Sequence, residues 1–437
     1  MRRLFACLVL VLTPCSGLFT AHAQIDPSTL AVRLESALAP VTETHDFSGV
    51  IAFRIGDGPI QLVSLGYADW QSGARFSGET RFPAGAITRT LTRAMADRML
   101  EAGTLHPDTP LSRYLPDLAG AEALAVGDLL DRTGRIDPAA AARTAWLPDA
   151  AAQASPIELD EAALARVIEI ARNARFETLI ASRFLGPLDM DNSLILDRHA
   201  GLNGLATGYT PGPRPLDLRP ASDPVVLPGH DGLYATAPDL VRLGQAVLER
   251  RIDLFQADGR MRAGWQAGQR EGYAHYAISV APSGYRTGII ALSPGEFVLA
   301  YAVNIESYPA EAVHTLILDL IFNADADLPV RPATVALDPS LLQAAGRYHS
   351  AVLGSLEMVQ GEGGLDIILP QSGRRDYLTP AGPDRLFWRR IGTELVLERD
   401  ESGRVVRLTG RRLTDAAGRA ITLERTDLPP LEAEPAD

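Results

Sequence analysis

Residues 82–92 read Phe-Pro-Ala-Gly-Ala-Ile-Thr-Arg-Thr-Leu-Thr and lead into a segment with helical periodicity. Apolar residues recur there at four-residue intervals, so they share one face of a helix. These residues are Ile87, Leu91, Met95 and Met99. The pattern predicts an amphipathic helix over residues 86–100.

The chain on both sides of this helix alternates between strand-like and helical patterns. Strands are expected at residues 47–55 and 60–67, joined by the turn signal Asp57-Gly58, and two or three more between residues 274 and 303. The Gly- and Pro-rich residues 200–230 predict a long surface loop. Further helices are expected at residues 27–40, 123–130, 161–184, 240–250 and 310–322.

The pattern changes near residue 328, where prolines become frequent, and from Ala345 onward it shows short strands separated by turns. We therefore expect two folded domains. The first, of mixed α and β structure, covers residues 24–328, and a small all-β barrel or sandwich covers residues 341–427. Residues 329–340 are expected to form a linker, and the acidic, Pro-rich residues 428–437 a disordered tail.

The composition is that of a folded globular protein and excludes several classes. Of 437 residues, 46% are hydrophobic and 22% charged, which is not typical of a disordered chain. The net charge of -13 argues against nucleic acid as a partner. All 41 cationic side chains are arginines. Because a guanidinium stays protonated, no step can use a side-chain amine as base or nucleophile.

The N-terminus predicts export. Arg2 and Arg3 precede the apolar run 4–12, and Ala21-His22-Ala23 follows, so residues 1–23 are expected to be a secretory signal cleaved after Ala23. The protein would then be periplasmic or secreted. Cys15 leaves a lipoprotein as an alternative, although Pro14 fits it poorly. The only other cysteine, Cys7, also lies in this segment, so the mature chain would have no disulfide. No later run is long enough for a transmembrane helix.

Several phrases, in a characteristic order, resemble the serine β-lactamase and penicillin-binding-protein-like superfamily, in its class C and esterase-like branch. They lie at residues 47–50, 66–69, 80–82, 100–105, 114–118, 184–190 and 231–240. The resemblance covers roughly residues 45–325. It implies an α+β fold with an antiparallel sheet covered by helices, an all-helical lobe, and an active site between them. The region from about residue 340 resembles a lipocalin-like barrel that is often attached to this family.

The family's nucleophile and base are missing from the matching positions. The resemblance implies a Ser-x-x-Lys motif at the start of a helix, where positions i and i+3 share one face. Here the tetrad is Ala86-Ile87-Thr88-Arg89. Alanine has no nucleophile, and arginine has no accessible neutral form. The Thr88 hydroxyl is expected on another face of the helix.

The family's other motifs also differ. Its Tyr-x-Asn motif falls at Pro156-Ile157-Glu158, and its Lys-Thr-Gly or His-Thr-Gly motif falls near Ile278-Ser279-Val280. A third stretch, near the helical lobe, reads Asp131-Arg132-Thr133-Gly134-Arg135. We therefore expect no catalytic residues. The candidates for lining a vestigial cleft or binding a ligand are Ala86, Thr88, Arg89, Thr133, His275 and Ser279.

Alternatives remain open for single residues. Arg89 could bind an anion or pair with a neighbouring carboxylate, and His275 could be a base or a structural residue. His230-Asp231 lacks the partners of a metal site, so no metal and no cofactor are expected. The four tryptophans, Trp70, Trp146, Trp265 and Trp388, are expected to be packing residues.

Three functions follow from this sequence. The first is a pseudoenzyme that binds a small molecule or an envelope protein. The second is an active hydrolase of esters, amides or β-lactams that uses other residues. The third is a structural or assembly component of the envelope.

Overall fold

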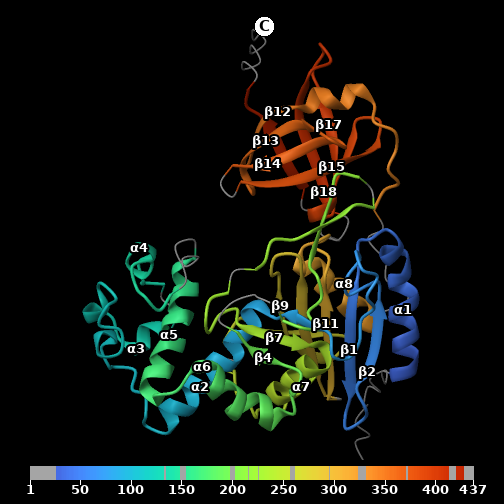
Figure 1. Ribbon diagram of the computed structural model, residues 1–437. Coiled ribbons are helices and arrows are strands. Elements are labelled where there is room, and N and C mark those ends of the chain that lie inside the picture. The colour runs from blue at the N-terminus through green and yellow to red at the C-terminus, as the bar shows by residue number, and fades with distance from the viewer. Residues whose placement is uncertain are drawn as a thin grey trace, which may run out of the picture.

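The computed structural model describes residues 26–131, 134–147, 154–196, 202–214, 216–224, 226–255, 261–294, 296–322, 331–370, 373–412 and 420–427. Figure 1 shows a central sheet packed between helices, a helical lobe to its left and a β-barrel above it. The predicted α+β architecture with a C-terminal barrel is confirmed. None of the described helices is both long enough and apolar enough to cross a membrane.

The central sheet is antiparallel with the strand order β2-β1-β11-β10-β9-β8. Its strands are β1 (Gly49–Ile55), β2 (Gln61–Leu65), β8 (Gln266–Arg270), β9 (Tyr273–Val280), β10 (Arg286–Ser293) and β11 (Phe297–Val303). The central strands β10 and β11 are buried on both faces, so they read as apolar runs without alternation.

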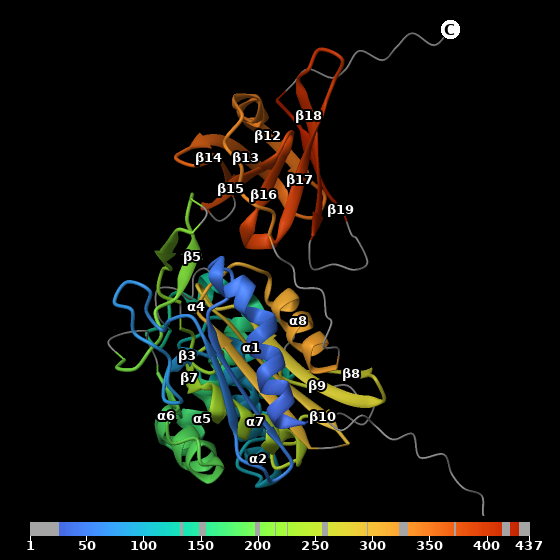
Figure 2. The ribbon, with the colours of Figure 1, turned by 90° about the vertical axis from the view of Figure 1, so that its right-hand side faces the viewer.

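Helices cover both faces of this sheet. Helices α1 (Pro27–Glu43) and α8 (Ala310–Phe322) pack on one face, where Leu34, Phe53 and Ile317 are buried together. Helix α7 (Ala237–Leu248) packs on the other face. A Cβ at Gly244 of α7 would lie 2.6 Å from Ile289 and 2.7 Å from Val298, so only glycine allows this close approach. Figure 2 shows α1 and α8 side by side on their face.

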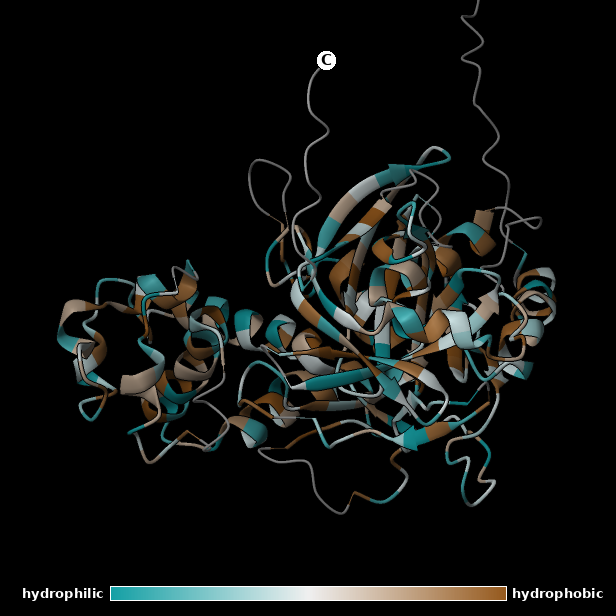
Figure 3. Ribbon diagram, turned by 90° about the horizontal axis from the view of Figure 1, so that it is seen from above, coloured by the Kyte–Doolittle hydropathy of each residue, from teal (hydrophilic) through white to brown (hydrophobic). Residues whose placement is uncertain are grey.

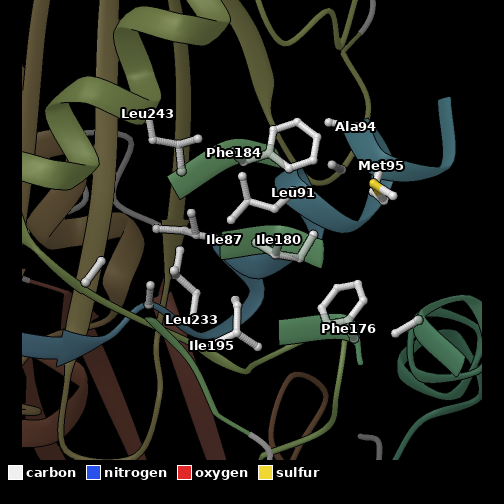
Figure 4. Close-up of a cluster of buried hydrophobic side chains, with 14 of the residues drawn as sticks. Ile87, Leu91, Ala94, Met95, Phe176, Ile180, Phe184, Ile195, Leu233 and Leu243 are labelled. Atoms are coloured by element: carbon white, nitrogen blue, oxygen red, sulfur yellow. The ribbon is translucent and has the colours of Figure 1, made fainter. Parts of the chain in front are cut away.

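Helix α2 (Thr88–Glu101) continues a 3-10 turn, η1 (Gly85–Ile87), and is the predicted amphipathic helix. Its apolar face is buried, as the four-residue spacing predicted. Figure 4 shows Ile87, Leu91 and Met95 among apolar side chains from other elements. Those side chains are Phe176, Ile180, Phe184, Ile195, Leu233 and Leu243. The packing fixes the start of α2 between the sheet and the helical lobe.

The helical lobe contains α3 (Val126–Leu130), α4 (Pro138–Ala141) and α5 (Pro156–Arg172), and α6 (Phe176–Ile180) follows α5. The predicted single helix over residues 161–184 is wrong. Asn173 adopts a left-handed conformation with φ 48°, which ends α5, and a π-helical turn at Ala181–Leu185 follows α6. Figure 3, seen from above, shows the lobe standing apart from the sheet.

The predicted surface loop at residues 200–230 is partly wrong. It contains a short antiparallel pair, β5 (Tyr209–Pro211) and β6 (Leu218–Pro220). Tyr209 is buried, and its hydroxyl donates to Asp69 Oδ1 at 2.9 Å. A three-stranded sheet lies nearby, with β3 (Arg81–Pro83), β7 (Leu233–Thr236) and β4 (Leu194–Ile195) in the order β3-β7-β4. The register of this sheet pairs Pro83 with Tyr234, next to the start of α2.

The C-terminal barrel is closed by eight antiparallel strands, β12 to β19 in sequence order. They are β12 (Gly346–Ser350), β13 (Gly354–Gly361), β14 (Gly364–Leu369), β15 (Arg374–Gly382), β16 (Arg385–Trp388), β17 (Thr393–Arg399), β18 (Val405–Arg412) and β19 (Ala420–Arg425). Apolar side chains such as Tyr348, Leu365 and Trp388 pack in its core. The Trp388 indole donates to Asp376 Oδ2 at 2.9 Å, which satisfies its buried N–H.

Two buried carboxylates of the first domain attach the barrel. Asp46, at the turn after α1, accepts from Arg389 Nε of the barrel at 2.5 Å, and Arg331 Nε lies 3.1 Å from its other oxygen. All three side chains are buried. The Arg389 guanidinium also donates to the carbonyl oxygens of Thr44 and His45. A buried ion pair with this many hydrogen bonds fixes the position of the barrel.

Glu306, which follows β11, is the second carboxylate. It pairs with Arg390 of the barrel and lies 3.3 Å from Arg286 Nη2. Its other oxygen accepts from the backbone N–H of Gly284 at 3.2 Å, in the turn between β9 and β10. Arg390 also lies 3.4 Å from Asp376 inside the barrel. A chain of alternating positive and negative side chains therefore connects the sheet with the barrel, in the order Arg286, Glu306, Arg390 and Asp376.

Candidate functional site

Ala86 lies in the 3-10 turn that opens helix α2, facing the end of β9. A Cβ on the preceding residue, Gly85, would lie 2.9 Å from Pro282 and 3.6 Å from Val280. The side chains closest to Gly85 from β9 and its following turn are therefore apolar. Ala86 itself is half-buried and presents only a methyl group.

The Thr88 hydroxyl is held inside the fold. It donates to the Gly85 carbonyl at 2.7 Å and accepts from the Leu233 N–H at 2.9 Å. The residue has no exposed surface. As the helical geometry predicted, this hydroxyl faces away from the Ala86 position and joins α2 to β7 instead.

Arg89 turns back along its own helix. Its Nε donates to the Ala86 carbonyl at 2.9 Å, and its guanidinium lies against the backbone of Gly264. A methyl group at Gly264 would overlap the guanidinium, and the φ of +84° also favours glycine there. The Arg89 guanidinium can therefore occupy this space only because residue 264 has no side chain.

A cavity of about 290 Å³ reaches Gly85, the residue before Ala86. Helix α5 contributes Glu158, which lies at the position predicted for the second family motif. Ser155 caps this helix, and Glu158 Oε2 accepts from the Ser155 N–H at 2.7 Å. The first turn of α5 therefore forms one wall of this cavity.

The walls of the cavity are mostly apolar. The apolar side chains are Pro83, Ala154, Pro224, Val226, Leu227 and Pro282. The polar side chains are Glu158, Asp231, Tyr234 and Ser283. Among the described residues of the lining there is neither arginine nor histidine. Burial raises the pKa of Tyr234, and the charges of Asp223 and Asp231 raise it further, so its hydroxyl stays protonated.

A second cavity, of about 790 Å³, lies on the other side of the first turn of α5. Two arginines of its lining, Arg93 and Arg262, pair with a carboxylate behind the lining. Arg93 Nε and Arg262 Nη1 lie 3.0 and 3.2 Å from the same oxygen of Asp97. Burial raises the pKa of Asp97, and the two arginines oppose that shift. The first cavity differs because its carboxylates face no cationic side chain of the lining.

His275 and Ser279 lie on the opposite face of the sheet from the Ala86 position. They share one face of β9 with Tyr273 and Ala277, which pack with α1 and α8, whereas Ile278 and Val280 lie on the other face, towards α2. The expectation that they line the cleft is therefore wrong, because strand side chains alternate between faces. Burial lowers the pKa of His275, and Arg270 lowers it further. Thr133 lies outside the described residues.

The structure places Asp231 in the lining of this cavity, although it is not among the predicted site residues. The sequence offers it within the family phrase at residues 231–240 and beside His230, whose Nδ1 lies 2.8 Å from Asp231 Oδ1. No three His, Cys, Asp or Glu side chains of the described chain lie close enough together to hold a metal ion. The signal that could have identified Asp231 is its place just before β7, which pairs with β3 at the start of α2.

Comparison with known proteins agrees with this geometry. A family model described as Beta-lactamase matches residues 34–322 of the 437-residue chain. The chain belongs to the beta-lactamase family. Among relatives, a beta-lactamase of Yersinia enterocolitica is 24% identical over 102 residues, which is 23% of this chain and 26% of that protein. The penicillin-binding protein 4 of Amycolatopsis lactamdurans is 24% identical over 234 residues, or 48% of this chain and 61% of the relative.

This beta-lactamase-family protein also resembles solved structures. The octameric penicillin-binding protein homologue from Pyrococcus abyssi superposes with a TM-score of 0.52 at 17% identity, over 92% of this chain and all of the other. A class C beta-lactamase gives a TM-score of 0.53 at 17% identity, over 70% of this chain and 99% of the other. At these identities the structures establish the fold. The chain spans about a quarter of the first relative's length and less than two thirds of the second's.

Proposed function

We propose that this protein is a pseudoenzyme that binds a ligand in the cavity beside Ala86 and does not turn it over. One observation carries this proposal. The residue at the start of α2 has only a methyl group where the family resemblance implies a serine nucleophile. The side chains nearest to the preceding residue, Gly85, are those of Pro282 and Val280, and neither has a group that transfers protons.

Three other groups near this position support the proposal. The Thr88 hydroxyl is fully engaged and buried. The Arg89 guanidinium keeps its proton, and the chain has no lysine to replace it. The pKa of Tyr234 is raised, so it does not supply a phenolate at neutral pH. An export signal at residues 1–23 would place this binding activity in the periplasm or outside the cell.

The test is covalent labelling of the purified full-length protein. We expect no mass increase with a fluorescent penicillin and no hydrolysis of an activated ester above background. The double variant Ala86→Ser with Arg89→Lys is expected to gain little activity, because the other two motifs are also absent. Ala102→Ser is the matched control, since it adds a hydroxyl at an exposed position at the other end of the same helix.

An acyl adduct on the unmodified protein, mapped by peptide mass spectrometry, would overturn the proposal and support an active hydrolase. Ester turnover that survives in Ala86→Val would do the same, because the reacting group would then lie elsewhere. If the protein neither reacts nor binds any small molecule, a structural role in the envelope becomes the better explanation.

A further inference from the structure

The cavity beside Ala86 has an unbalanced charge. Glu158 and Asp231 both line it, from α5 and from the segment before β7. In a chain with 41 arginines, the described lining of this cavity contains none. The carboxylates at the domain interface are instead paired with arginines.

One oxygen of each carboxylate lies beside a nitrogen of the protein, and only the Glu158 oxygen accepts a hydrogen bond there. Glu158 Oε2 accepts from the Ser155 N–H, and Asp231 Oδ1 lies 2.8 Å from His230 Nδ1. The second oxygen of each has no partner among the residues that the structure describes. Both side chains are partly exposed, so these oxygens are accessible to a ligand.

The rest of the cavity limits the size and shape of what it can hold. About 290 Å³ is near the lower end of the volumes found for small-molecule sites. The walls around the carboxylates are formed by the rigid or branched side chains of Pro224, Val226, Leu227 and Pro282. Such walls suit a small apolar group, while carboxylates suit a donor of several hydrogen bonds.

We propose that this cavity binds an organic cation, a primary ammonium on a short apolar body, through Glu158 and Asp231. This inference rests on the proposed function and specifies its ligand class. An ammonium offers three donors, so it can donate to both carboxylates, and its positive charge is attracted to both, whereas a carboxylate in the same place would face two like charges. The cavity therefore selects for cations and against anionic ligands.

The experiment compares three probes of nearly equal size by isothermal titration calorimetry on the full-length protein. Benzylamine is cationic at neutral pH, benzyl alcohol is neutral and benzoate is anionic. We expect benzylamine to bind at least tenfold more tightly than benzyl alcohol and benzoate to bind least. The preference for benzylamine should shrink at high salt, because screening weakens interactions between charges.

Two variants locate the site. Glu158→Gln keeps the helix cap, and Asp231→Asn keeps the shape of the side chain. Each is expected to weaken benzylamine binding about tenfold and to leave benzyl alcohol binding unchanged. Glu357→Gln, on the exposed face of β13, is the matched control and should change neither.

Equal binding of the three probes, tighter binding of benzoate, or no binding of benzylamine would overturn the inference. So would variants that leave the benzylamine affinity unchanged. Failure of the proposed function has a different signature, because acyl labelling or ester turnover could appear while the preference for cations persists.

Discussion

The domain interface and the cavity beside Ala86 both contain carboxylates, but only those at the interface are paired with arginines. At the interface, Asp46 and Glu306 are buried and each meets two arginines. In the cavity, Glu158 and Asp231 face no cationic side chain of the described lining. The comparison indicates that charges at the interface stabilise one arrangement of the two domains, whereas charges in the cavity remain available to a ligand.

The largest effect is expected at the interface. Replacing Asp46 by alanine would leave Arg331 and Arg389 buried without their shared counter-charge. Removing one partner of a buried ion pair costs about 3–5 kcal/mol. We expect the free energy of unfolding, measured by urea denaturation, to fall by that amount.

The control for Asp46→Ala is Glu249→Ala. Glu249 pairs with Arg251 at 2.8 Å on the surface, where such pairs contribute at most about 1 kcal/mol. If both variants lose equal stability, the interface pair has no special role and the contrast between the two regions fails.

A smaller effect is expected for a buried titratable group without a counter-charge. Burial, together with a smaller effect of His275, lowers the pKa of His314 from the ordinary value of 6.5 to about 4. The unfolded chain therefore binds the proton more readily, and stability is lost as pH falls from about 6.5 towards 4. From these values the protein should be about 2 kcal/mol less stable at about pH 5 than at about pH 7.

The measurement is urea denaturation at both pH values, on the protein and on His314→Asn. The Tyr301 hydroxyl lies 3.2 Å from His314 Nδ1, so the variant also loses this contact at every pH. Its stability should nevertheless depend less on pH. An unchanged pH dependence would show that other groups cause the acid sensitivity.

The smallest effect is expected in the cavity. Glu158→Gln and Asp231→Asn should each change the free energy of unfolding by less than about 0.5 kcal/mol, since glutamine keeps the helix cap and asparagine keeps an oxygen beside His230 Nδ1. The same urea experiment measures this. A loss above about 2 kcal/mol in either variant would mean that its carboxylate stabilises the fold, and the two regions would then be alike.

Many helices and strands could be predicted because the spacing of apolar residues along the chain indicates them. The four-residue spacing of Ile87, Leu91, Met95 and Met99 fixed the buried face of α2, and all four side chains are buried. The end of α5 was not predicted. Asn173 ends the helix in a left-handed conformation, but apolar residues recur at helical spacing both before and after it. Local periodicity says little about such caps.

The site was predicted less completely. The family register pointed to Ala86 and Arg89, because these positions follow readable phrases, whereas Glu158 was not among the predicted site residues. His275 and Ser279 were assigned to the cleft although they point away, since the sequence of β9 alone does not show which face meets α2. Asp46 and Arg389 are 343 positions apart in the sequence, so no local pattern predicts that they pair.

The sharing of Asp46 by Arg331 and Arg389 has a consequence for how such a protein can evolve. If another barrel replaced this one, Asp46 and Glu306 would each lose one of their two arginines, Arg389 and Arg390, and keep only Arg331 and Arg286. A replacement barrel that preserves this interface therefore needs two guanidinium groups at the positions of Arg389 and Arg390.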